Sequence, residues 1–454
     1  MSMGGGPLEL ARRRAQSMAA IARVRGEVEP WVARWKQRPA QASQLARLDA
    51  TLTLMLTRLR EVADGVAGDE RGFRGWQGVD FHLAMIERLW WHYRDRLAPR
   101  LEAGGAVAGA LAAADDVIWS CAEVSAAMRA GEPPPLPLAC LEPTLAANAP
   151  PRETLPPGTQ PRDAALAACV ALMPVPLIAV TTAAIDEPWW LALLAHETGH
   201  HVQYDLEPAQ ALVERTGALL TLHGGARWTA WRKEVFADAF AIATLGPEAN
   251  EVIAALEWGA TGELAAERGG YPPVVVRLAI GAELAKELGF AAVRYDVAAW
   301  RARLAEIADE RVATRIAADL DRVVGAAGRD GFAAALAAML VGDVALRDAP
   351  KRTAAEDVGS VEAVAYDAVL GGSARVLQPH RRKSRLVAAA AFRAFRTANA
   401  TADLGDLRDR TLALFAQVRD TTTKRAAAPV KAASEAVASS MWAAVEIARA
   451  EELP

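Results

Sequence analysis

Three of the seven histidines in this chain fall within one short apolar stretch, at positions 196, 200 and 201 of "LLAHETGHHV". His196 and His200 are four residues apart, so on a helix their imidazoles project from the same face, with Cβ atoms about 6 Å apart. That separation allows two ring nitrogens to reach one metal ion at about 2 Å each. The spacing therefore predicts a metal-binding helix, and the alternative is a buried helix that carries polar residues.

A second stretch, "WTAWRKEVFADAFAIATLG" at 228–246, carries two acidic residues with the same spacing. Glu234 and Asp238 lie on one face of a predicted helix that is rich in aromatic residues, where unpartnered carboxylates are costly to bury. A metal ion would provide the partner, with Glu234 as a third ligand and Asp238 accepting the free N–H of a ligating histidine. The alternative is a solvated face with two unrelated acids.

Small residues on both predicted helices favour close packing between them. Gly199 lies within the histidine stretch, and Ala237 and Ala241 lie beside the two acids. Side chains of this size allow two helix backbones to approach each other. We therefore expect the helices to cross at short range and to bring the carboxylates to the histidines.

These residues resemble a known group of enzymes. The pattern "HETGH" followed by "EVFAD" is similar to the HExxH and ExxxD motifs of the gluzincin zinc metallopeptidases. The longer strings "LLAHETGHHV" and "EVFADAFA" look like the CAAX-prenyl-protease-type family and its small soluble relatives, the minigluzincins. A third string, "YPPVVVRLAI" at 271–280, is similar to the His-Pro-(Pro)-x-x-x-Arg-Ile segment of that family. The resemblance covers about residues 170–285.

The resemblance implies a zinc-dependent peptidase that hydrolyses peptide bonds of a peptide or protein substrate. Zinc would be held by His196, His200 and Glu234, with the fourth position left for water. Glu197 would take a proton from the metal-bound water and deliver it to the leaving amine. Asp238 would support a ligating imidazole.

Two departures from the family pattern affect what can be carried over. Tyr271 stands where the family has a histidine, so either Tyr271 or Arg277 is a candidate to hold the developing oxyanion. The membrane enzymes of the family have several spans that this chain lacks, so a prenylated substrate is not implied. We expect the strand near 176–180 to pair with an extended substrate.

Two other classes of function remain open from the sequence. One is a regulatory or binding protein with a structural zinc site, which would have no use for Glu197. The other is a zinc hydrolase that acts on a non-peptide amide. Physiological substrate, cleavage specificity and oligomeric state have no signature in the sequence.

Composition limits the partners and the compartment. The 454 residues are 52% hydrophobic and 23% charged, which is typical of a globular protein of two or three domains. A formal net charge of −4 does not favour nucleic acid as a partner. Cys121, Cys140 and Cys169 are odd in number and lack metal-type spacing, so we expect a reducing, cytoplasmic location without disulfides.

The expected fold is mainly α, with helical N- and C-terminal regions around a small α+β zincin-like core that contains a short β-sheet. The expected order is a helical domain at 1–130, a Pro-rich linker at 131–162, a metallopeptidase domain at 163–290 and an Ala-rich helical domain at 291–454. Apolar residues recur at spacings of three and four in the first domain and predict a bundle core rather than a coiled-coil dimer: Leu45, Leu48, Leu52, Met55, Leu59 and Val62.

One charge-free segment, 164–185, is long enough to span a bilayer. Pro174 and Pro176 interrupt it, and its flanks lack the basic residues that set orientation. We therefore expect a short buried helix followed by a buried strand, "PLIAV", and regard a membrane span as the alternative.

The other histidines, the basic cluster and Cys140 are expected to have structural roles and not to belong to the metal site. His82 and His92 do not share a helix face and are expected to be structural. His201 is expected on a helix surface and His223 in a glycine-containing loop. The cluster "HRRKSR" at 380–385 is expected to be a solvated helix start, with phosphate binding as the alternative. Cys140 is expected in the extended linker, where masking of the zinc is a remote alternative.

Overall fold

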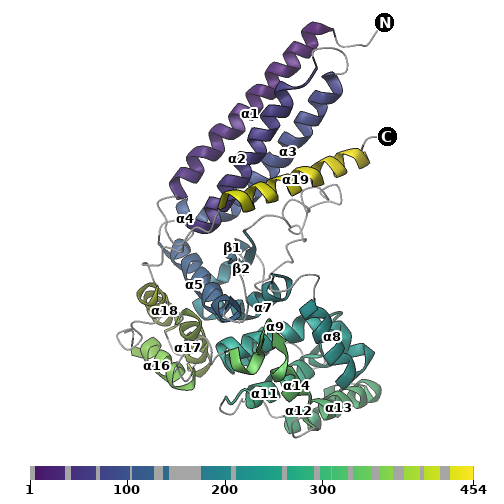
Figure 1. The fold of residues 1–454 in the computed structure, drawn as a ribbon. Coiled ribbons are helices and arrows are strands. Elements are labelled where there is room, and N and C mark those ends of the chain that lie inside the picture. The colour runs from purple at the N-terminus through teal and green to yellow at the C-terminus, as the bar shows by residue number, and fades with distance from the viewer. Residues whose placement is uncertain are drawn as a thin grey trace. The chain divides into compact units, whose positions relative to one another are not determined.

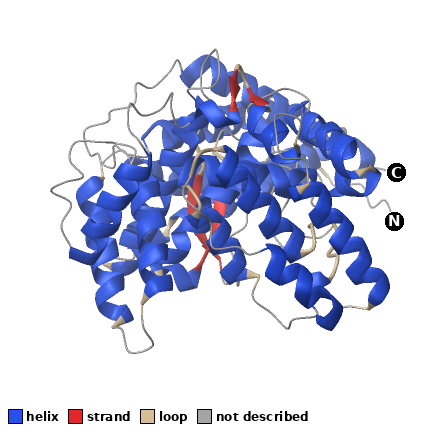
Figure 2. Ribbon diagram, turned by 90° about the horizontal axis from the view of Figure 1, so that it is seen from below, coloured by secondary structure: helices blue, strands red, loops and turns tan. Residues whose placement is uncertain are grey.

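The computed structural model is mainly helical, as expected, with two small sheets among the residues that it describes (Figure 2). The described residues are 6–35, 42–67, 72–102, 105–126, 136–142, 175–205, 211–257, 263–290, 297–307, 309–325, 331–349, 358–371, 383–398, 403–419 and 430–452.

The chain divides into two compact units that are not consecutive in sequence. The first contains 1–102, 150–176 and 420–454, and the second contains 103–149 and 177–419. The domain boundaries expected near 130, 162 and 290 do not coincide with those of the units. The physical reason is visible within the first unit, where the C-terminal helix buries an apolar face against N-terminal helices.

The first unit is a helical bundle. It contains α1 (Pro7–Trp35), α2 (Ala42–Asp64), α3 (Gly72–Leu97), α4 (Pro99–Glu102) and α19 (Val430–Glu452). Figure 1 shows α1, α2 and α3 running side by side. The apolar positions of α2 from Leu45 to Leu59 are buried in the core of this unit, whereas Val62 is 42% exposed. The seam therefore packs within the chain, as the bundle interpretation predicts.

His82 joins α3 to the C-terminal helix of the same unit. Its ring is buried and stacks on Trp442 of α19 with a centroid distance of 4.1 Å. One ring nitrogen lies 2.8 Å from the carbonyl of Gly78, and the other lies 3.2 Å from Glu446. These contacts confirm the structural role expected for His82. The second histidine of α3, His92, has a pKa lowered to about 3 by burial and by Arg96.

The second unit begins with α5 (Ala106–Ala126) and a two-stranded parallel sheet. Strand β1 (Leu138–Glu142) pairs with β2 (Leu177–Thr181), and the register aligns Leu138 with Leu177. The strand predicted for "PLIAV" is confirmed, and it is largely buried. The helix predicted before it lies outside the described residues.

Part of the expected Pro-rich linker is instead a buried strand. Residues 138–142 read "LACLE", a proline-free apolar run that β2 covers on one edge. On β1 the backbone N–H of Ala139 donates to the carboxylate of Asp115 on α5, at 2.8 Å. Cys140 is consequently buried in a sheet and does not lie on an extended surface segment. The linker prediction was wrong here because it weighted the flanking prolines over the short run between them.

The helices that position the candidate site follow β2 in the sequence. They are η3 (Thr182–Ile185), η4 (Pro188–Leu193), α7 (Leu194–Asp205), α8 (Ala211–Gly224), η6 (Ala226–Trp231), α9 (Arg232–Leu245), α10 (Glu248–Leu256), η7 (Glu263–Ala265) and α11 (Val274–Glu287). The rest of the unit consists of α12 (Val297–Ile307), α13 (Glu310–Val324), α14 (Phe332–Ala338), β3 (Leu340–Val341), β4 (Val344–Ala345), η8 (Leu346–Asp348), α16 (Val358–Gly371), α17 (Ser384–Thr397) and α18 (Leu404–Val418).

The basic cluster at the start of α17 is buried where the structure describes it. Lys383, Ser384 and Arg385 are each at most 3% exposed, and Arg385 donates to the carbonyl of Ser120 on α5 at 3.0 Å. The expected solvated helix start was therefore wrong for these three residues, because α17 packs against α5 and η4. Residues 380–382 lie outside the described part of the chain.

None of the described helices is by itself long and apolar enough to cross a bilayer. The bent pair Gly72–Leu101 and Ala106–Val124 has the length and the composition to do so, on those two criteria alone.

Candidate metal centre

Gly199 of α7 lies directly against α9. A Cβ atom built on Gly199 would lie 2.9 Å from Cα of Ala237 and 3.1 Å from its carbonyl oxygen. Backbone atoms cannot yield in the way that the end of a flexible side chain can, so no larger residue fits at this crossing. Ala237 and Ala241 are both buried. The prediction that small residues bring these two helices together is confirmed.

The acidic helix α9 is enclosed from Glu234 onward. Each of its residues from Glu234 to Leu245 is buried, including Asp238. The alternative of a solvated face with two unrelated acids is therefore excluded. Two buried carboxylates need compensating partners, and the structure supplies them from α7 and α11.

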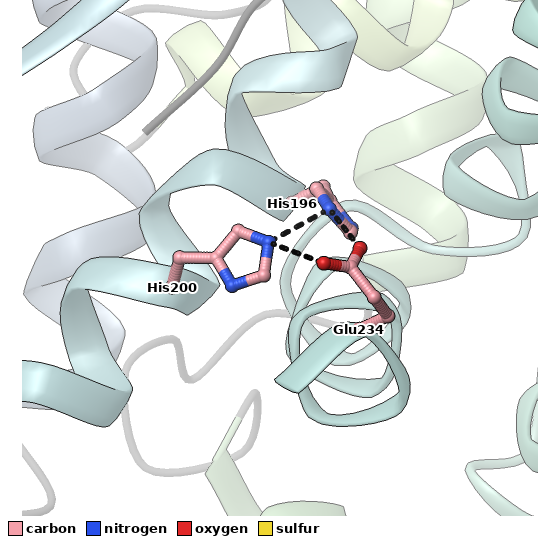
Figure 3. Close-up of side chains that lie close together, drawn as sticks. All are labelled: His196, His200 and Glu234. Carbon is pink, nitrogen blue, oxygen red and sulfur yellow. Dashed lines mark hydrogen bonds and ion pairs between the residues drawn. The ribbon is translucent and has the colours of Figure 1, made fainter. Parts of the chain in front are cut away.

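Three side chains converge where α7 faces α9 (Figure 3). Nε2 of His196 lies 3.1 Å from Nε2 of His200 and 3.4 Å from Oε2 of Glu234. Nε2 of His200 lies 3.6 Å from Oε1 of Glu234. Ligand atoms placed about 2.0–2.1 Å from a tetrahedral zinc ion are separated by about 3.3–3.4 Å. Among the described residues, this buried group is the one whose ligand atoms lie close enough together to hold a metal ion.

Asp238 lies behind His196 as seen from this group. Its Oδ1 lies 2.7 Å from Nδ1 of His196 and favours a proton on that nitrogen. With a proton on Nδ1, the lone pair of a neutral His196 ring is on Nε2, which faces the group. Asp238 thus sets both the orientation and the tautomer that a metal ligand needs.

Arg277 of α11 lies among three carboxylates. Its Nε and Nη2 donate to Asp238 at 2.7 and 2.8 Å, and its Nη1 donates to Glu257 at 2.9 Å. Nη2 is also 3.7 Å from Glu234. The guanidinium is buried, and the attraction of these acids outweighs the effect of burial and raises its pKa. Arg277 therefore neutralises the acidic side of the centre.

The same charges shift the pKa values of the four groups on α7 and α9. Burial lowers the pKa of His196, but Asp238 outweighs it and raises the value to about 10. The pKa of His200 falls to about 3 because the ring is buried and lies beside His196. The pKa values of Glu234 and Asp238 are lowered despite burial, Glu234 by its contact with His196 and Asp238 mainly by Arg277.

Tyr271 forms the exposed edge of the site. It is 40% exposed, and its ring lies 5.4 Å below the guanidinium of Arg277. Burial of part of the ring and the charge of Glu234 raise its pKa to about 12, so the phenol keeps its proton at neutral pH and remains a hydrogen-bond donor. Its backbone N–H donates to the carbonyl of Arg268 at 3.1 Å.

Glu197 is 5% exposed in the first turn of α7, next to the first histidine of the group. The negative charge of Glu197 helps to raise the pKa of His196, where Asp238 has a larger effect. It also helps to raise the pKa of Tyr271, where burial has a larger effect. The carboxylate of Glu197 is thus close enough to both residues to influence their ionisation.

Two other histidines are placed differently from the sequence predictions. His201 is only 4% exposed, because α7 is covered by α5 and η4 as well as by α9, so its expected surface position was wrong. His223 lies within α8 and not in a loop, with its ring 5.6 Å from that of Phe332. The buried group of potential ligands includes neither residue and no cysteine among the described residues.

Sequence reasoning missed two residues that contact this centre. Glu257, just after α10, binds both Arg277 and Arg268, and no spacing connects it to the HExxH motif. Gln203 lies on α7 and donates from Nε2 to the carbonyl of Arg232 at 3.3 Å. A signal for Gln203 was present, because it is three residues after His200 and seven after His196, and so shares their helix face.

Comparison of the chain with protein-family models, curated protein sequences and solved structures gives no match in any of the three.

Proposed function

We propose that this chain is a zinc-dependent metallopeptidase of the gluzincin type, with a zincin-like core built around α7 and α9. The observation that supports the proposal most directly is the convergence of His196, His200 and Glu234 at ligand spacing beside Glu197. Two nitrogens and one carboxylate oxygen suit zinc, and three protein ligands leave one position open, which is typical of catalytic sites. A peptide or protein is the proposed substrate.

Two histidine nitrogens and one glutamate oxygen are donors that suit zinc. When bound by these three residues, zinc would polarise the scissile carbonyl and make water a stronger nucleophile. Glu197 would accept the proton of the attacking water and pass it to the leaving amine. The protonated phenol of Tyr271 would donate a hydrogen bond to the oxyanion that develops.

The role of Arg277 in this proposal is to hold the protein ligands. All three of its guanidinium nitrogens face acids within 4 Å, and two of them donate to Asp238. A guanidinium engaged in this way is poorly placed to serve a substrate oxygen as well. Of the two oxyanion candidates, we therefore favour Tyr271.

A structural zinc site in a binding protein is the second candidate, and the burial of the ligands favours it. His196, His200 and Glu234 are each at most 9% exposed. A purely structural site gives no role to Glu197 in the first turn of α7 or to the half-exposed Tyr271 beside the ligands. Replacement of Glu197 distinguishes the two candidates, because it should abolish hydrolysis in a peptidase and have no effect on a structural zinc site.

The purified chain should bind about one zinc ion, measurable by elemental analysis and by calorimetric titration of the metal-free protein. At neutral pH, binding should also release close to one proton, because His196 is protonated with its pKa near 10 and must free Nε2, whereas His200 is already neutral. Titration in two buffers of different ionisation enthalpy counts this proton. A chain that neither carries nor takes up zinc would exclude both candidates.

Glu197→Gln should lose about 10²–10⁴-fold in peptide hydrolysis while it keeps zinc and helicity, because the side chain acts on a proton and is not among the ligands. Substrates are to be found by mapping new protein N-termini in cells that express wild type or the variant. Glu214→Gln, an exposed position on α8, is the matched control and should behave as wild type. Equal cleavage by Glu197→Gln and wild type would favour the structural candidate.

A further inference from the structure

Gln203 is a fully buried polar residue of α7, and its side chain reaches to α9, the other helix that carries a proposed ligand. It is 0% exposed, and its amide nitrogen donates to the carbonyl of Arg232, the first residue of α9, at 3.3 Å. This bond fixes the orientation of the amide, since the nitrogen must face Arg232 and Oε1 must face the other way. Among the described residues no donor is within hydrogen-bonding geometry of Oε1, which is also shielded from solvent.

His200 has the complementary requirement. Its Nε2 faces His196 and Glu234, and Figure 3 shows the second ring nitrogen, Nδ1, turned away from both. A neutral ring whose Nε2 lone pair faces a metal carries its proton on Nδ1. Since the ring is buried, that N–H needs an acceptor inside the protein. The carboxylate that serves His196 in this way, Asp238, lies 2.7 Å from Nδ1 of His196.

We propose that Gln203 is a positioning residue for the metal centre, whose Oε1 accepts the Nδ1–H of His200 and thereby fixes the ring with Nε2 toward the metal. Residues three apart on a helix lie on the same face, which puts the amide within reach of the ring. The inference rests on the metal site of the proposed function and adds the means by which its second histidine is oriented.

The two histidines of the group would then be supported differently, His196 by the charged carboxylate of Asp238 and His200 by a neutral amide. Because the amide also holds Arg232, Gln203 connects the orientation of His200 to the start of the helix that bears Glu234.

The test compares zinc affinity across three single variants of the full chain, by competition with a chromophoric chelator. Gln203→Met removes the acceptor at similar side-chain length and should weaken zinc binding by about 10–100-fold. Gln203→Glu keeps an acceptor and should bind zinc close to wild type, although loss of the bond to Arg232 lowers fold stability. Thr198→Val is the matched control, because Thr198 is buried on the same helix and its hydroxyl donates only to Leu194, at 2.6 Å.

The tautomer of His200 provides a second readout that a purely structural role would not change. Ring ¹⁵N spectra of the metal-free wild type at neutral pH should show the proton of His200 on Nδ1, and Gln203→Met should shift it toward a mixture. This measurement decides the matter even if Gln203→Met fails to fold, because a wild-type proton on Nε2 would overturn the inference.

The outcomes separate this inference from the proposed function. If wild type binds zinc and Gln203→Met binds it equally well, Gln203 has no positioning role although the metal centre stands. The same conclusion follows if Gln203→Glu loses as much affinity as Gln203→Met, since rescue by a retained acceptor would then be absent. If wild type binds no zinc, the metal centre itself is wrong.

Discussion

Glu234→Ala should leave the chain essentially free of zinc at stoichiometric metal. Glu234 supplies the only oxygen among the three potential ligands, and both of its oxygens lie within 3.6 Å of an imidazole Nε2. Removal of one ligand from a three-ligand site leaves two histidines, which is too few to hold zinc tightly. Elemental analysis after dialysis against equimolar zinc measures the loss.

Asp238 provides the comparison, because it contacts His196 and not the group of ligand atoms. Asp238→Ala should load partly and bind zinc about 10–100-fold more weakly than wild type. It also leaves the buried Arg277 without its closest acid, which costs about 3–5 kcal/mol of stability. Asp238→Asn retains an acceptor and is therefore the milder variant at the same position. If Asp238→Ala or Asp238→Asn lost zinc more completely than Glu234→Ala, the assignment of ligand and support would be reversed.

Gly199→Ala should destabilise the protein and weaken zinc binding without touching any potential ligand. In an unpacked helix this change is favourable by about 1 kcal/mol, because alanine has the higher helix propensity. Here the new methyl group would meet backbone atoms of Ala237 at 2.9 and 3.1 Å, and overpacking of that kind costs about 1–3 kcal/mol. Packing outweighs propensity, so α7 must move away from α9 and separate the histidines from Glu234.

Gly109→Ala is the matched control for this prediction. Gly109 lies within α5 of the same unit, and a Cβ atom there would meet no atom within 4 Å. The control should be neutral or stabilising by about 0.4–1 kcal/mol. Thermal unfolding and zinc content are measured for both variants. Unchanged stability and zinc content in Gly199→Ala would show that α7 and α9 are not packed as closely as described.

Features that depend on spacing along one helix could be read from the sequence. The four-residue intervals of His196 with His200 and of Glu234 with Asp238 are properties of helix geometry, and so is the small size of Gly199. These local patterns predicted two helices that cross closely, with the histidines on one face of the first helix and the acids on one face of the second. The strand at 177–181 followed in the same way from an uninterrupted apolar run.

Other features depended on what packs opposite a residue, which no local pattern contains. His201 was expected at the surface because it points away from His200, yet a helix enclosed on several sides has no solvent-facing side. The strand at 138–142 formed among prolines because β2 and Asp115 satisfy its backbone. The buried start of α17 at Lys383 likewise reflects α5, which is more than 250 positions away in the sequence.

The sequence by itself determined the chemistry available at the centre, since it placed two imidazoles on one helix and two carboxylates on another. The tertiary structure decided how those groups are held: Arg277 pairs with Asp238 and Glu257, and Gln203 reaches across to Arg232. The physical reason is that helix periodicity fixes neighbours within about two turns, whereas a buried charge or amide takes its partner from whichever element packs against it.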